Sequence, residues 1–137
     1  MQTIIVGFDD TEPATRALRR AAEIAGKFGA KLVVTRVAPR SLTVARSAGH
    51  LDPGEEPGET AEELADARAL LGDAAASAEF VPAEGETADT IVQLAEQRNA
   101  DLIVVGTREP GILARLLGQS VSDSVARQAH CDVLIVH

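Results

Sequence analysis

The sequence has very few aromatic residues, and this shortage argues against one class of function. Its 137 residues include three phenylalanines and neither tryptophan nor tyrosine. Proteins that bind single-stranded nucleic acid stack the bases on aromatic side chains, so we expect no such platform here. A formal net charge of −8 also disfavours a broad surface for polyanions. The core is therefore expected to be aliphatic, and nucleic acid is not an expected partner.

Cysteine and long apolar runs are equally scarce. The single cysteine, Cys131, cannot form a disulfide within the chain, which fits a reducing cytoplasm. No apolar run approaches the roughly 20 residues of a membrane helix. Met1 leads straight into an apolar segment with no basic signal region before it. We therefore expect a cytoplasmic protein with no membrane segment and no secretory signal.

Motifs for catalysis and for metal binding are also missing. The three histidines, His50, His130 and His137, are scattered, and none forms an obvious ligand pair with Cys131. No G-x-S-x-G elbow and no complete P-loop signature occurs. We therefore expect neither an enzyme nor a metal site, although the sequence leaves a slow ATPase activity open.

What the chain does contain is a regular alternation of two patterns. Runs of β-branched and other apolar residues predict five strands, at 3–8, 31–37, 78–81, 102–105 and 133–136. Apolar residues spaced three and four apart predict helices between them, beginning near Pro13, Thr60, Thr87 and Ser120. Strands that alternate with helices pair in parallel through right-handed crossovers. The pattern therefore predicts one α/β domain, residues 1–137, built on a parallel sheet.

Individual residues indicate where these elements begin and end. Thr11 or Glu12 is expected to cap the first helix, and Thr87 is expected to cap the helix before strand 102–105. Gly29 is placed to end the first helix, and Pro82 to end the third strand. The segment 40–58 shows no clear period.

The candidate site lies where strands end. In open parallel sheets, ligands bind at the carboxyl ends of the strands, near the point where the strand order reverses. Asp9 could hold a metal ion or a ribose hydroxyl there, but capping of the following helix is the simpler interpretation. Gly106 either allows a ligand close to the backbone or serves a turn with positive φ. Ser120 either caps the last helix or donates its hydroxyl to a phosphate, and with Gly106 it brackets a loop typical of phosphate sites.

Four segments together resemble the universal stress protein family. They read IIVGFDDTEPATRAL, KLVVTRV, EGETADTIVQLAEQRNADLIVVGT and SVSDSVARQAHCDVLIV. The resemblance covers nearly the whole chain and is least determined between residues 40 and 60. It implies a Rossmann-like, adenine-nucleotide α-hydrolase-like fold, an open five-stranded parallel sheet of order 3-2-1-4-5 with helices on both faces. It also implies a homodimeric stress-response module, paired antiparallel through the last strand, 133–136, and acting on an unidentified regulatory protein partner.

In nucleotide-binding members of this family, the segment after the fourth strand resembles the motif G-x-x-G-x9-G-[S/T]. Gly106 matches the first glycine and Ser120 the final hydroxyl, but Glu109 and Gln119 stand where the other two glycines are expected. A Cβ atom obstructs a backbone that must wrap closely around phosphate. Glu109 also adds negative charge beside the anionic oxygens. The resemblance therefore implies weak or lost ATP binding.

Five other positions keep the residues of the binding members: Gly7, Asp9, Val37, Val105 and Val121. By the resemblance, Asp9 faces the nucleotide, the backbone of Val37 meets adenine, and Val105 and Val121 flank the phosphate loop. The alternative is therefore an ATP- or AMP-binding switch, with Mg²⁺, whose remodelled loop uses Gly111 and Gly118.

Overall fold

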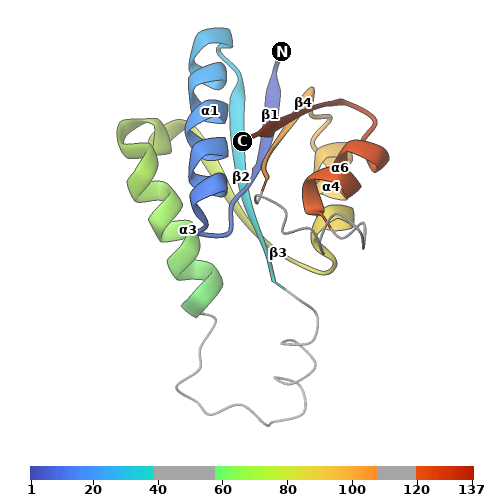
Figure 1. Ribbon diagram of the computed structural model, residues 1–137. Coiled ribbons are helices and arrows are strands. Elements are labelled where there is room, and N and C mark those ends of the chain that lie inside the picture. The colour runs from blue at the N-terminus through green and yellow to red at the C-terminus, as the bar shows by residue number, and fades with distance from the viewer. Residues whose placement is uncertain (39–57, 108–119) are drawn as a thin grey trace, which may run out of the picture.

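The computed structural model describes residues 1–38, 58–107 and 120–137. Within these ranges the chain forms a five-stranded sheet in the order β3-β2-β1-β4-β5, and every pair of neighbouring strands is parallel. Figure 1 shows helices on both faces of this sheet. The predicted fold and strand order are therefore confirmed.

The strands that the structure describes are β1 (Thr3–Gly7), β2 (Lys31–Ala38), β3 (Ala78–Glu84), β4 (Leu102–Gly106) and β5 (Asp132–Val136). β1 lies at the centre, where Val6 is in register with Val34 on one side and Val104 on the other. All three of these valines are fully buried. A central strand covered on both faces needs apolar side chains at consecutive positions, which explains why these strands read as unbroken apolar runs.

Two aliphatic clusters join the sheet to its helices. The helices α1 (Glu12–Phe28) and α3 (Gly58–Leu71) cover one face, while α4 (Thr87–Gln97) and α6 (Val121–Gln128) cover the other. Alanines at 17 and 21 of α1 are fully buried beside Leu18, which brings that helix close to the strands. Of the three phenylalanines, Phe8 alone is buried. The core is therefore aliphatic, as the composition predicts.

Two of the predicted element ends are confirmed and two are wrong. Thr11 caps α1, and Gly29 ends it with a left-handed φ of 64°. Glu86, rather than Thr87, caps α4, because its carboxylate accepts from the N–H groups of Ala88 and Asp89 at 3.3 and 2.8 Å. Pro82 does not end β3, which continues to Glu84. In the described chain β3 is an edge strand, where a missing N–H is tolerated.

The remaining described element is a 3-10 turn, η1 (Gly72–Ser77), which connects α3 to β3. The helix predicted to begin near Thr60 begins at Gly58. Most of the segment 40–58 lies outside the described residues. Among the described helices, none combines the length and the apolar character that a bilayer-spanning segment requires.

Candidate functional site

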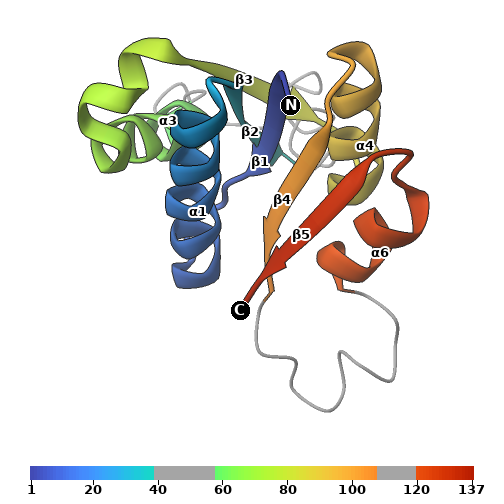
Figure 2. The same ribbon diagram turned by 90° about the horizontal axis from the view of Figure 1, so that it is seen from above.

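The strand order reverses between β1 and β4, which are neighbours in the sheet. β1 leads into α1 on one face, whereas α6, the next described helix after β4, lies on the other face. Figure 2 shows α1 and α6 on opposite sides of these two strands. The carboxyl edge between β1 and β4 is therefore the position at which open α/β sheets bind ligands.

Asp9, two residues beyond β1, organises the start of α1. Its Oδ1 accepts from the N–H of Thr11 at 3.2 Å and from the Thr11 hydroxyl at 2.6 Å. The Thr11 Oγ1 in turn accepts from the N–H of Ala14 at 3.4 Å. The predicted capping of α1 by Asp9 is therefore wrong, because Thr11 is the N-cap and Asp9 only supports it. Its role toward a nucleotide stays a prediction.

Packing explains the two glycines of the candidate site. A Cβ on Gly106 would lie 2.4 Å from the carbonyl oxygen of Pro13, in the first turn of α1. Gly106 is not among the residues with positive φ, so the turn interpretation of this glycine was wrong. A Cβ on Gly7 would lie 3.1 Å from Cδ1 of Ile91 on α4. The absent side chains let helices from both layers approach the ends of β1 and β4.

Ser120 occupies the start of α6. Its Oγ accepts from the N–H of Asp123 at 3.4 Å, which makes it the N-cap, and lies 2.7 Å from Oγ of Ser122. The Ser122 side chain is buried, whereas Val121 is 38% exposed. Backbone N–H groups and the helix dipole favour an anion at such a terminus, while the carboxylate of Asp123 in the same turn opposes one.

The two remaining candidate residues belong to the core. Val37 and Val105 are nearly fully buried, and both pack in the cluster under α4 and α6. Their side chains therefore serve the fold, and only their backbones remain available for contact with a ligand. Val105 immediately precedes Gly106, so it reaches the carboxyl edge through β4.

Two residues near this edge were not assigned by the sequence interpretation. Glu86 caps α4. The sequence predicted Thr87, at the next position, because threonine is the more usual cap. Ser122 places a buried hydroxyl beside Ser120. Its burial depends on how α6 lies against the sheet, so no local pattern reveals it.

Several predictions about the phosphate loop lie outside the described residues, namely those on Glu109, Gln119, Gly111 and Gly118. Within the described part, no three His, Cys, Asp or Glu side chains gather as metal ligands.

Two carboxylates with lowered pKa values lie at the opposite, amino edge of the sheet. The pKa of Glu79 is lowered mainly by hydrogen bonds from Lys31 and Arg98. The pKa of Asp101 is lowered mainly by the backbone N–H groups of Thr3 and Gln2. These ionised groups hold the amino ends of the strands and the N-terminal segment together, and they take no part in the candidate site.

Comparison with known proteins identifies the family. The family model described as "Universal stress protein family" matches residues 1–137. Universal stress protein Rv1636 of Mycobacterium tuberculosis (strain H37Rv) is 40% identical over 99% of this chain and 96% of its own length.

Two similar solved structures contain a nucleotide. A universal stress protein in complex with cAMP is 34% identical, with a TM-score of 0.76 over 99% of this chain and 97% of that one. The universal stress protein from Archaeoglobus fulgidus in complex with dAMP is 26% identical, with a TM-score of 0.73 over 100% and 98% of the two chains. With the family model and the sequence relative, they show that the chain belongs to the universal stress protein family.

Proposed function

We propose that the protein is a non-catalytic stress-response regulator that binds an adenine nucleotide with one phosphate, and binds ATP weakly or not at all. The observation that carries this proposal is the carboxyl edge between β1 and β4, where the strand order reverses and the start of α6 presents the Ser120 hydroxyl. The nucleotides in the complexes of the two solved relatives, cAMP and dAMP, each carry a single phosphate.

Charge supports a preference for one phosphate over three. A helix N-terminus capped by a serine suits a single phosphate. A triphosphate brings more negative charge toward Asp123 and toward a loop that contains Glu109, in a chain of net charge −8. Like charges held close together repel, so each added phosphate weakens binding. The glycines that would let the backbone wrap a triphosphate are replaced at Glu109 and Gln119.

The remaining parts of the proposal concern the whole chain. Residues 1–137 act as one domain in the cytoplasm and form a homodimer through β5. Nucleotide binding changes the surface offered to an unidentified regulatory protein. The absence of a catalytic motif from the sequence supports a role without chemistry.

Calorimetry with cAMP, AMP and ATP plus Mg²⁺ tests the ligand. We expect cAMP or AMP to bind at least about tenfold more tightly than ATP, a difference of about 1.4 kcal/mol. If neither cAMP nor AMP gives a heat of binding, the proposed site is contradicted. If ATP binds more tightly than both, the proposed preference is contradicted. Steady release of phosphate from ATP would contradict the non-catalytic role.

Substitution of Ser120 separates its two roles. Aspartate is a good N-cap, so Ser120→Asp is expected to keep the stability of α6 while its charge repels a phosphate. Ser77→Asp is the matched control, because Ser77 lies in η1, where its hydroxyl donates to the carbonyl of Ala74. We expect Ser120→Asp to abolish the binding of the nucleotide and Ser77→Asp to leave it unchanged. Equal binding by both variants would remove Ser120 from the site.

A further inference from the structure

One of the two edges of the described sheet is formed by β5. In the described part of the chain β5 pairs with β4 on one side and with no strand on the other (Figure 2). Its four apolar residues, at 133–136, are only partly buried, whereas Asp132 is exposed. An unpaired apolar edge invites another strand. The inference below rests on the proposed homodimer, in which a second copy of β5 occupies this edge.

The geometry of β5 limits how two copies pair. A two-fold axis perpendicular to the sheet makes the strands antiparallel and keeps the same face of each protomer on the same side. All five residues of β5 are paired only if Leu134 lies opposite Leu134 of the partner subunit. Val136 then lies opposite the partner's Asp132.

The alternation of side chains decides which face this aspartate occupies. Leu134 and Val136 pack against the cluster under α1 and α3, whereas Val133 and Ile135 pack under α4 and α6. Side chains along a strand point alternately to the two faces. Asp132 therefore lies on the same face as α1. In the dimer, the partner's Asp132 reaches that face beside Val136.

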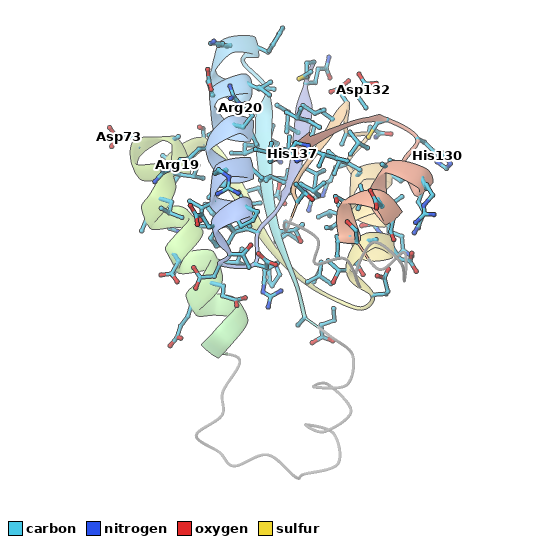
Figure 3. The ribbon with its side chains drawn as sticks, viewed as in Figure 1. Arg19, Arg20, Asp73, His130, Asp132 and His137 are labelled. Atoms are coloured by element: carbon cyan, nitrogen blue, oxygen red, sulfur yellow. The ribbon has the colours of Figure 1, made fainter. Side chains whose placement is uncertain are left out.

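Arg16 of α1 is held at this end of β5. Its Nε donates to the backbone oxygen of His137 at 3.0 Å, and its Nη1 lies 3.2 Å from Oε1 of Glu12. Its other terminal nitrogen, Nη2, has no acceptor among the described residues. Figure 3 shows His137 beside α1 and Asp132 at the opposite end of β5. A protomer therefore cannot bring its own Asp132 to Arg16, but an antiparallel partner can.

We propose that, in the dimer, Nη2 of Arg16 binds the carboxylate of the partner's Asp132, and that the two-fold axis repeats this ion pair. The guanidinium is already oriented by the backbone oxygen of His137, so little side-chain freedom is lost when the carboxylate arrives. This ion pair forms in only one register of the two β5 strands, the one centred on Leu134. A shift of the centre to Val133 places the partner's Asp132 opposite Leu134, away from the end of β5 that Arg16 contacts.

Reversal and exchange of the charges test the ion pair. Sedimentation equilibrium gives the dimer dissociation constant for the wild type, Arg16→Asp, Asp132→Arg and the double variant. We expect each single variant to weaken the dimer about tenfold, and the double variant to recover to within about threefold of the wild type. Arg19→Asp is the matched control. It makes the same charge change on α1, where Arg19 is exposed and has no ion pair among the described residues, and should leave the constant nearly unchanged.

The outcomes distinguish the ion pair from the dimer itself. A wild type that stays monomeric overturns both the proposed dimer and this inference. A wild-type dimer whose single variants match Arg19→Asp, or whose double variant shows no recovery, overturns the ion pair alone. If a charge-reversed variant fails to fold, Arg16→Gln and Asp132→Asn replace it. Each should weaken the dimer about threefold and reduce its sensitivity to NaCl, and an unchanged sensitivity overturns the ion pair.

Discussion

Gly106→Ala tests whether the glycine after β4 serves packing or a ligand. The added Cβ would lie 2.4 Å from O and 2.5 Å from C of Pro13, and 2.8 Å from N of Ala14. All three are backbone atoms in the first turn of α1. Ordinary contact begins near 3.4 Å, so the start of the helix would have to move by about 1 Å. Thr11 caps that turn, and Ala14 and Ala17 are buried beneath it, so the movement is resisted.

The expected cost follows from that resistance. Overpacking against backbone costs about 1–3 kcal/mol, and we expect Gly106→Ala to fall at the upper end, near 3 kcal/mol. Gly7→Ala should cost less, about 1 kcal/mol, because its Cβ would meet the movable end of Ile91 at 3.1 Å. Gly26→Ala is the control. Nothing lies within 4 Å of its added Cβ, and alanine should stabilise α1 by about 0.5–1 kcal/mol.

Urea unfolding followed by circular dichroism, at one protein concentration and without nucleotide, measures the series. From the most to the least stable, we expect the order Gly26→Ala, wild type, Gly7→Ala, Gly106→Ala. It would be refuted if Gly106→Ala were as stable as the wild type. If that variant also lost the binding of cAMP, the glycine would belong to the ligand site and not to the contact with α1.

Two further predictions concern helix capping and pH. Glu86→Ala should destabilise the protein by about 1 kcal/mol because two N–H groups at the start of α4 lose their acceptor, whereas Thr87→Ala should have little effect in the same urea experiment. The opposite result would restore Thr87 as the cap. The pKa of Glu79 is lowered in the folded protein from its ordinary value of 4.5. Its ion pairs with Lys31 and Arg98 therefore stabilise the protein fully above pH 4.5, and this stabilisation is lost as the pH falls through the lowered pKa of the folded state. The stability difference between wild type and Glu79→Gln should therefore be constant near pH 6 and shrink below about pH 4.5, and a difference that grows on acidification would contradict the assignment.

The sequence predicted most of the architecture because the signals for it are local. Alternating strand and helix patterns indicated a parallel sheet, and the resemblance to universal stress proteins supplied its order. Thr11 was one of two candidate caps, and Ser120 a candidate cap of the last helix; both roles depend on a side chain near its own helix start. The error at Pro82 has a different origin. Whether a proline ends a strand depends on whether its missing N–H faces a neighbour, and β3 has a neighbour on one side only in the described sheet.

The candidate site was predicted less completely. The residues named for it do gather at the carboxyl edge of β1, β2 and β4 and at the start of α6. The sequence favoured helix capping over a ligand role for Asp9. In the structure Thr11 is the cap and Asp9 accepts hydrogen bonds from it, while a role toward a ligand stays a prediction. The sequence offered ligand approach or turn geometry as reasons for Gly106. The turn is wrong, close packing against α1 is a reason that the sequence did not indicate, and ligand approach stays a prediction.

By itself, then, the sequence determined the family, the parallel α/β fold, the aliphatic core, both ends of α1 and the start of α6, because these follow from periodicity and from contacts within a few residues. Only the tertiary structure showed that Gly106 packs against the first turn of α1 and that Arg16 lies at the carboxyl end of β5. Those features arise where β4 meets the first turn of α1 and where Arg16 meets His137. The residues involved are far apart in the chain, and only the folded sheet brings them within a few ångströms.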